Sequence, residues 1–477
     1  MSQIPARPGT VRWISVGTFL TFSLLFALTY GYIPWLQYNW AFNLLGYPPE
    51  LIAWSITALA LLTTTEEARR GLIRAAEALQ AAVSGWSRGR LDILVLAAVF
   101  TLLLLCRERV MLGESRFLYL LVSGDPAWTY PGSGGLFVLR AVDEIAPILG
   151  LPGLPTAQLL HCGAGALAVV FVLHAARQAI PEGRSAGAVP LLVFSGGLFA
   201  AIAGRYEIQP LALCASAGYL ALALRFLHGR GGMAAPALAF GLAAWLQPLC
   251  LFAAPGLLYL PRLAGRRFTA AVGLSLVPLL LHTAQLLAFA EKDVSTPSLL
   301  ASVWIGNQGW VRGWGSGPSV VTDYVLLSAP HLKYLANAGF LLAPAMLPIA
   351  VAILGLRRRA ALVPPAVRFV ATTTAGLLLG SLALRPAWGP FDWDLFAVTG
   401  LWIGFLGAIL LARIEAREVR THVAAAAVGL QICFVGLPMT LIGQGAAIDR
   451  GLFDGKDFDP LLLRSDRPAP KHIAPWL

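Results

Sequence analysis

The stretch LDILVLAAVFTLLLLCRERVMLGESR, residues 91–116, decides the fold that we expect for this chain. Its apolar run ends at Cys106, and charged residues follow at once. A charged side chain costs roughly 2.5–3.5 kcal/mol at the centre of a bilayer helix. The stretch is therefore predicted to be a membrane span that delivers a polar segment into water at one face. The charged residues of that segment are Arg107, Glu108, Arg109, Glu114, Arg116 and Asp125.

The composition of the whole chain points the same way. Of its 477 residues, 57% are hydrophobic and only 12% are charged, which is typical of a polytopic membrane protein. Apolar runs of about 17–23 residues predict helices, because barrel strands would alternate over about ten. The net charge is 35 − 24 = +11. Its basic residues lie mostly in short loops, where they set orientation, so nucleic-acid binding is not expected.

About thirteen spans of roughly 20 residues are predicted, with the arginine-rich loops in the cytoplasm. This places the N-terminus inside and the C-terminus outside. One region, 233–261, is expected to form a short hairpin or a re-entrant pair broken near Gln247-Pro248. The spans are predicted at about 13–34, 50–64, 91–106, 156–176, 187–204, 208–225, two within 233–261, 268–290, 333–355, 367–384, 395–412 and 421–443.

Three regions are expected along the chain. Residues 1–90 form an N-terminal transmembrane hairpin and a cytoplasmic amphipathic segment, 91–443 the transmembrane core, and 444–477 a periplasmic tail. Residues 136–150 are too few and too charged to span, so an amphipathic helix at the outer face is predicted there.

Four polar segments are predicted to reach the same outer face: 107–135, the turn at Arg205, 291–332 and 385–394. Their arginines run against the cytoplasmic bias of basic residues. One explanation is the binding of an anionic group, since a guanidinium fork matches phosphate geometry. The candidates are Arg116, Arg312 and Arg385. The alternative is pairing with a nearby acid, for example of Arg107 or Arg109 with Glu108.

Glu114 lies in a Gly-Glu-Ser sequence just after the predicted helix end. A glycine lets the backbone turn sharply and would place this carboxylate near the membrane surface. It could act as a general base toward an acceptor hydroxyl or help to hold a cation. The alternative is that Glu114 and Ser115 cap the helical stretch that follows.

Asp392-Trp393-Asp394 is the second acidic site. Pro386 and Pro390 favour extended chain before it, in which residues two apart share one side and could bind one divalent ion. Alternatively, Asp394 caps a helix that begins at Leu395 and stabilises it by about 1 kcal/mol.

The segment 304–314 interleaves tryptophans with glycines, amides and an arginine. Asn307 and Trp310 are candidates for contact with a sugar, although tryptophans at an interface also serve as anchors. The sequence contains no P-loop, no G-x-S-x-G and no H-E-x-x-H, so ATPase, α/β-hydrolase and zinc-protease functions gain no support.

In this arrangement the chain resembles the GT-C superfamily of integral membrane glycosyltransferases, which use polyprenyl-phosphate-linked sugars. The resemblance covers roughly residues 91–443. It is clearest at Leu112-Gly113-Glu114-Ser115-Arg116, where such proteins often have Gly-Asp, and at Asp392-Trp393-Asp394-Leu395-Phe396, a run found in GT-C-like bacterial polytopic proteins. The chain departs from the pattern in having Glu114 in place of the usual aspartate and an additional hairpin at about 13–64.

The resemblance implies a GT-C-like fold and inverting hexosyl or pentosyl transfer from a polyprenyl-phosphate donor, at the outer face of a bacterial inner membrane. A lipid, a glycan or a protein would be the acceptor. Glu114 would be the base, with Asp125 as its substitute, and Arg116, Arg312 or Arg385 would hold the donor phosphate. Asp392 and Asp394 would bind sugar hydroxyls or a divalent cation, Mg or Mn. The alternatives are a transporter or flippase of a lipid-linked or amphipathic substrate, and a non-catalytic membrane subunit.

Overall fold

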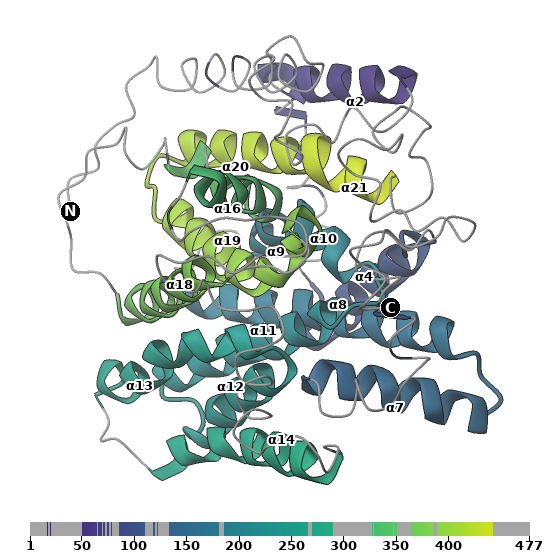
Figure 1. Ribbon diagram of the computed structural model, residues 1–477. Coiled ribbons are helices and arrows are strands. Elements are labelled where there is room, and N and C mark those ends of the chain that lie inside the picture. The colour runs from purple at the N-terminus through teal and green to yellow at the C-terminus, as the bar shows by residue number, and fades with distance from the viewer. Residues whose placement is uncertain are drawn as a thin grey trace.

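The described residues of this protein form helices and contain no strand (Figure 1). The computed structural model describes residues 50–63, 85–109, 133–180, 186–265, 270–289, 329–346, 348–350, 364–384 and 389–441, with single positions elsewhere. The helices are α2 (Glu50–Thr63), α4 (Arg88–Leu105), α7 (Gly134–Ile148), α8 (Gly153–Ala179), α9 (Ala188–Phe194), α10 (Gly197–Ile202), α11 (Gln209–Leu227), α12 (Ala234–Leu246), η3 (Pro248–Ala253), α13 (Ala254–Leu263), η4 (Ala270–Ser275), α14 (Leu276–Phe289), α16 (Ala329–Leu342), α18 (Pro365–Ala383), η5 (Gly389–Phe396), α19 (Ala397–Ala412), α20 (Arg417–Gln431), η6 (Ile432–Gly436) and α21 (Leu437–Leu441). Of these, η3, η4 and η5 are 3₁₀ helices, and η6 is a π-helix.

Among the described residues, five helical segments are long and apolar enough to cross a membrane. They are Gly153–Ala179, Gln209–Leu227, Pro365–Ala383, Trp393–Ala412 and Arg417–Leu441. Each coincides with a predicted span, so the expectation of a polytopic helical membrane protein is confirmed. The total number of spans stays a prediction.

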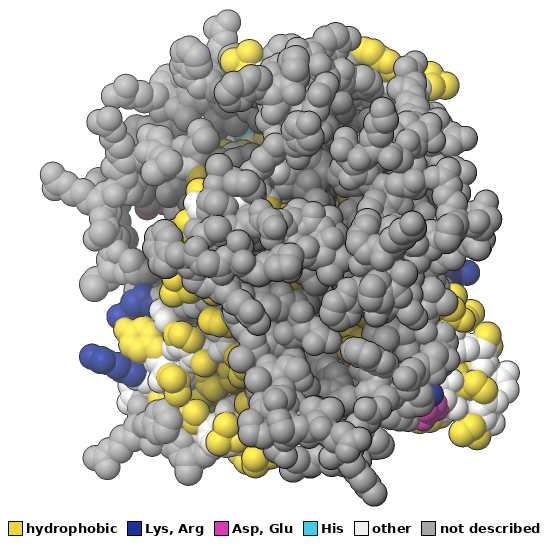
Figure 2. Space-filling model, viewed as in Figure 1, with side chains coloured by type: hydrophobic (Ala, Val, Ile, Leu, Met, Phe, Trp, Pro, Cys, Tyr) yellow, Lys and Arg dark blue, Asp and Glu magenta, His cyan; other side chains and the backbone are white. Residues whose placement is uncertain are grey.

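The surface of the bundle suits a bilayer. Large apolar side chains are exposed on many helices, among them Leu102 on α4, Leu191 on α9 and Leu379 on α18. Apolar side chains also reach the surface over the lower part of the molecule in Figure 2. So many large apolar side chains at the surface of a helical bundle are suited to contact with lipid.

The inside of the bundle is packed closely by small residues and aromatic rings. In Figure 1, α8 and α11 lie side by side. Near the bundle centre the indole Nε1 of Trp402 on α19 donates a hydrogen bond of 2.8 Å to Ser216 Oγ on α11. The rings of Tyr219 and Phe369 surround the same indole, with centroids 5.6 and 5.7 Å away. These contacts join α11, α18 and α19.

The predicted break near Gln247-Pro248 is confirmed. Helix α12 ends at Leu246, and 3₁₀ helix η3 begins at Pro248, whose nitrogen has no hydrogen to donate. Gln247 between them is extended, with φ −143° and ψ 112°. Its side chain Nε2 donates to Leu395 O at 2.7 Å and so connects this break to the residues that precede α19.

A second break was not predicted. The span expected at 187–204 is divided at Ser195-Gly196 into α9 and α10. Gln431 on α20 bonds the chain at this break, since its Nε2 donates to the backbone oxygen of Leu192 at 2.9 Å and to the side-chain Oγ of Ser195 at 2.8 Å. A buried side-chain amide thereby replaces part of the hydrogen bonding that the helix loses at its break.

Helix α7 is the amphipathic helix predicted at 136–150. It has 15 residues, which is too short to span, and Ser133 caps its N-terminus by accepting from Leu136 N. Its buried side, including Leu139, packs toward α8, whereas Ile148 is 82% exposed. This division between the two sides is typical of a helix at a membrane interface.

Candidate functional site

Arg205, in the turn between α10 and α11, is the centre of a buried charged cluster. Its guanidinium lies close to three carboxylates, with Nη1 3.2 Å from Asp394 Oδ2, Nε 3.6 Å from Glu108 Oε1 and Nη2 3.7 Å from Glu207 Oε1. The residue is only 7% exposed. The ring of Trp393 covers the guanidinium, whose central carbon lies 5.4 Å from the ring centroid. We call Glu108, Arg205, Glu207, Trp393 and Asp394 the Arg205 cluster.

A glycine forms the turn that presents Arg205. Gly204 has φ +65°, a conformation that side chains disfavour. A Cβ at this position would lie 2.9 Å from Arg107 Cβ and 3.0 Å from Cys162 Sγ. The end of α4 and the side of α8 therefore approach the backbone here more closely than an alanine would permit.

Backbone hydrogen bonds hold the end of α4 and the Arg205 turn together. Glu108 N donates to Ala203 O at 3.2 Å, and Gln158 Nε2 on α8 donates to Glu108 O at 2.9 Å. His161, one turn further along α8, bonds Arg205 O through Nδ1 at 2.5 Å. The histidine is wholly buried. Helix α8 thus fixes the main chain on both sides of the Glu108–Arg205 ion pair.

Asp394 enters the cluster from a helix and not from extended chain, so the predicted conformation of Asp392-Trp393-Asp394 is wrong. Residues 389–396 form the 3₁₀ helix η5, whose early Pro390 is compatible with a first helical turn. With about three residues per turn, side chains two apart do not share a side. The capping alternative is also wrong, because Phe396 is the N-cap of α19 and no side chain caps it. Asp394 instead pairs with Arg205.

The cluster has more acidic than basic groups. Glu207 and Asp394 are 0% and 1% exposed, and Glu108 is also buried. Because burial penalises uncompensated charge, this arrangement favours a shared proton or a further cation close by.

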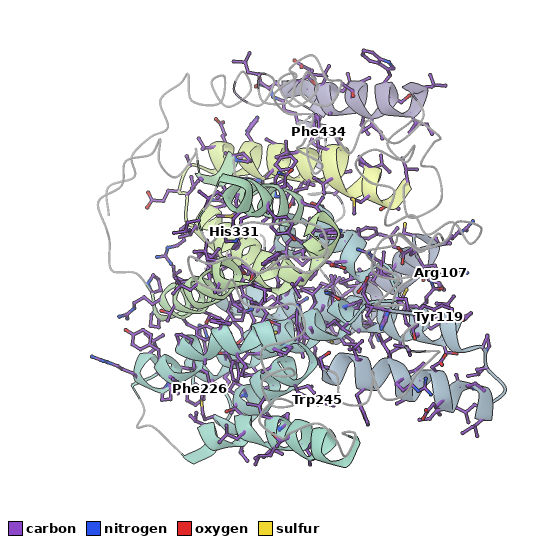
Figure 3. The ribbon with its side chains drawn as sticks, viewed as in Figure 1. Arg107, Tyr119, Phe226, Trp245, His331 and Phe434 are labelled. Carbon is purple, nitrogen blue, oxygen red and sulfur yellow. The ribbon has the colours of Figure 1, made fainter. Side chains whose placement is uncertain are left out.

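An aromatic group extends the cluster toward the segment that follows α4. Tyr206 is buried, and its ring packs edge-on against Tyr119 at 5.4 Å and against His161 at 6.5 Å. Its hydroxyl finds no hydrogen-bond partner among the described residues. Burial raises the pKa of this hydroxyl well above its ordinary value, with Asp143 and Tyr119 adding to the effect. In Figure 3, Arg107 and Tyr119 lie at one end of the bundle, far from Phe226 at the other.

Three of the four predicted outer segments meet here. Glu108 comes from 107–135, Arg205 and Glu207 from the turn, and Asp394 from 385–394. Just after the fourth segment, 291–332, the ring of Tyr334 on α16 contacts that of Phe396 at 5.8 Å. The prediction that distant polar segments share one end of the bundle is thus supported by direct contacts.

Most of the predicted site residues lie outside the described residues. Asp392 belongs to η5 by its backbone, but only Asp394 is placed with its side chain. The others outside are Glu114, Arg116, Asp125, Asn307, Trp310, Arg312 and Arg385.

The sequence did not single out Arg205, Glu207 or Glu108 as site residues. Glu108 was expected to pair, if at all, with the adjacent Arg107 or Arg109, and it pairs instead with Arg205. The available signal was the isolated Arg-Tyr-Glu sequence at 205–207, which places two charges between apolar spans.

A different ion pair joins α4 and α8 at their other ends, away from the Arg205 cluster. Asp92 accepts from Arg177 Nη1 at 2.6 Å and lies 2.9 Å from His174 Nε2. Since Glu108 and Gln158 meet at the other ends of the same helices, α4 and α8 are antiparallel. This agrees with their predicted opposite directions across the membrane.

Within the described part of the chain, no group of three or more His, Cys, Asp or Glu side chains could hold a metal ion.

An apolar helical bundle, a short amphipathic helix beside it and polar segments gathered at one end define a polytopic helical membrane protein. The chain is similar to the crystal structure of ArnT from Cupriavidus metallidurans bound to undecaprenyl phosphate. The similarity has a TM-score of 0.50 at 15% sequence identity, and covers 76% of this chain and 78% of that one. ArnT from the same organism in the apo state matches with a TM-score of 0.46, also at 15% identity, over 77% and 78% of the two chains. No family model and no curated protein matches the sequence.

Proposed function

We propose that this protein is a membrane glycosyltransferase that moves a hexosyl or pentosyl group from a polyprenyl-phosphate donor to a lipid, glycan or protein acceptor. The observation that carries the proposal is the meeting of Glu108, Arg205 and Asp394, from three distant segments, at one end of a GT-C fold. The ArnT structure of this fold was obtained with undecaprenyl phosphate bound, which supports a polyprenyl-phosphate lipid as the donor carrier.

The proposed orientation puts this end of the bundle at the outer face of a bacterial inner membrane. The arginines support this orientation, because they gather in the loops at the other ends of the spans, above all at Arg357-Arg358-Arg359. With thirteen spans the N-terminus is cytoplasmic and the C-terminus periplasmic. The donor would then reach the site laterally from the outer leaflet, and the acceptor from the periplasm.

The donor phosphate needs a guanidinium that can bind it through two parallel hydrogen bonds. Arg205 is already surrounded by carboxylates, so Arg116, Arg312 and Arg385 are the proposed phosphate ligands. Asn307 and Trp310 are proposed to contact the sugar.

Glu114 is the proposed general base, with Asp125 as its substitute. In an inverting transfer the acceptor oxygen forms the new bond to the anomeric carbon while the bond to the phosphate oxygen breaks. The polyprenyl phosphate leaves with that electron pair, and the acceptor proton passes to the carboxylate. A membrane-surface site that excludes water would favour transfer over hydrolysis.

A divalent cation, Mg or Mn, was expected at Asp392 and Asp394, and it stays a prediction. The described residues do not favour it. Asp394 is engaged by Arg205, and η5 does not have the extended geometry that would align the two carboxylates. We therefore assign no step to a metal.

The second candidate function is a transporter or flippase of a lipid-linked substrate. Discontinuous helices favour it, and this chain has two, at Ser195-Gly196 and at Gln247-Pro248. Against it, the ion pairs Asp92–Arg177 and Arg205–Asp394 belong to opposite ends of the bundle and not to its middle. A non-catalytic membrane subunit is the third possibility and has no specific observation in its favour.

The test is a transfer assay on purified protein with a panel of polyprenyl-phosphate sugars. Wild type is expected to release polyprenyl phosphate and to glycosylate an acceptor from a membrane extract. Glu114→Gln is expected to lower kcat by about 10²–10⁴-fold, because it removes the base. Glu144→Gln, an exposed acid on α7 that pairs with Arg140, is the control and should retain activity.

Two outcomes would contradict the proposal. Absence of transfer by wild type with every donor of the panel would exclude the glycosyltransferase. Full activity of Glu114→Gln would exclude Glu114 as the base and direct the search to Asp125.

A further inference from the structure

We propose that Arg205 is a positioning residue, which holds the segment after α4 and the segment before α19 in register for transfer without touching the donor. The inference rests on the proposed function and deepens it. The first of these segments contains Glu114, and the second contains Arg385. Both carry residues of the proposed chemistry, and both are tied to Arg205 at a buried acid.

Arg205 is itself rigidly anchored. Its carbonyl oxygen is bonded by His161 from the N-terminal third of α8, and its turn requires the positive φ of Gly204. Trp393 covers one face of its guanidinium. Its side chain therefore extends from a turn that is fixed to α8, the longest described helix.

From that point the guanidinium contacts both segments at once. Asp394 lies 189 residues further along the chain, and its Oδ2 is 3.2 Å from Nη1. Glu108, the other partner, also bonds α8 through its carbonyl and the Arg205 turn through its amide. Displacement of Arg205 would release the side-chain connection between the two segments while α8 still held the end of α4.

The surroundings of Arg205 argue against a direct role in phosphate binding. Its side chain is 9% exposed, and the carboxylates of Glu108, Glu207 and Asp394 face it. A phosphate brought to this cluster would meet three acids, and like charges at such distances repel. The guanidinium is therefore suited to orienting its neighbours.

The two roles predict different kinetics. A donor-binding arginine, when replaced, raises KM for the donor. A positioning arginine lowers kcat, because misplacement of reacting groups by about 1 Å can cost about 10²-fold. We expect Arg205→Met to lower kcat per folded molecule by about that factor at a nearly unchanged KM, and Arg205→Lys, which keeps the charge without the fork, to recover part of the loss.

Arg177→Met is the matched control. Arg177 on α8 ion-pairs Asp92 of α4, at the ends of these helices that lie away from the Arg205 cluster. If Arg205 acts only through stability, both variants should lower the amount of folded protein, and neither should change kcat per folded molecule.

A second measurement does not depend on activity. Spin labels at Arg109→Cys and Gly389→Cys, in a background without the five native cysteines, report the distance between the two segments by pulsed electron paramagnetic resonance. We expect a narrow distribution in wild type and in Arg177→Met, and a clearly broader one in Arg205→Met and in Arg205→Lys.

The outcomes separate this proposal from the proposed function. An unchanged distance distribution in the Arg205 variants would overturn the positioning role, whatever the activity. A selective rise in donor KM would overturn it in favour of phosphate binding. If wild type transfers no sugar while the distribution broadens as expected, the glycosyltransferase fails and the structural connection through Arg205 stands.

Discussion

The Arg205 guanidinium and the Asp394 carboxylate form a buried ion pair of 3.2 Å between residues 189 positions apart. The pair joins the turn before α11 to the segment before α19. Glu108, which also pairs with Arg205, connects the end of α4 to the same cluster. An ion pair placed between loops at the end of a membrane bundle can determine how those loops face one another. This relationship makes one end of the bundle a candidate site and not merely a set of turns.

Replacement of Arg205 should destabilise the protein strongly. Arg205→Met would leave three carboxylates buried without their guanidinium, and loss of one partner of a buried pair costs about 3–5 kcal/mol. Thermal unfolding in detergent measures the loss. Arg177→Met, in a partly exposed pair, should cost clearly less. Equal shifts for the two variants would show that the cluster does not differ from an ordinary surface pair.

Gly376 should not tolerate a side chain. A Cβ added to this residue on α18 would collide with the carbonyl oxygen of Phe252, where η3 packs on α18. Gly376→Ala is therefore expected to lower the unfolding temperature by separating the two elements, at a cost of about 1–3 kcal/mol. Gly163→Ala on α8 is the matched control. Nothing lies within 4 Å of its added Cβ, so this change should be neutral or stabilising by about 0.5–1 kcal/mol. Tolerance of alanine at Gly376 would contradict the α18–η3 contact.

The hydrogen bond between Trp402 and Ser216 should contribute modestly to stability. Interhelical bonds of this kind inside membranes are worth about 0.6 kcal/mol on average and up to about 1.7 kcal/mol. Unfolding of Trp402→Phe, Ser216→Ala and the double variant, combined in a thermodynamic cycle, gives the coupling energy directly. We expect a value in that range. A coupling energy of zero would mean that the 2.8 Å contact between α19 and α11 makes no net contribution.

Tyr206 should make stability sensitive to alkaline pH. Burial raises the pKa of its hydroxyl, with Asp143 and Tyr119 adding to the effect, so the folded protein keeps the phenolic proton longer than the unfolded chain. This contribution is full below about pH 10, the ordinary pKa of tyrosine, and is lost as the pH rises through the folded-state value. Between about pH 8 and about pH 11 the unfolding temperature of wild type should fall more than that of Tyr206→Phe. Parallel curves for the two proteins would contradict the burial of this hydroxyl.

The fold class could be predicted because hydrophobic length and charge placement act locally. The apolar run at 91–105 predicts a span, and the charges from Arg107 onward are expected to lie outside the bilayer, whatever the rest of the chain does. The same local reasoning predicted α7 from its charged, short apolar stretch. It also predicted the break at Gln247-Pro248 from the missing proline N–H.

Features that depend on packing between distant segments escaped prediction. Glu108 has two arginines as sequence neighbours, yet it pairs with Arg205, because the turn at Gly204 brings that side chain to the end of α4. The run before α19 coils into η5, and from there Asp394 reaches Arg205. The break at Ser195-Gly196 did have a local signal in its paired glycines, but Gln431, which bonds it, lies 236 residues from Ser195.

The most direct test of the account is the sidedness of its two acidic segments. Glu114→Cys and Asp392→Cys, each in a background without native cysteines, can be labelled in intact cells with a membrane-impermeant maleimide. A cysteine at Arg358 serves as the cytoplasmic reference. We expect positions 114 and 392 both to react from outside and position 358 to react only after the membrane is opened. Reaction of 114 and 392 from opposite sides of the membrane would contradict a shared site at one face.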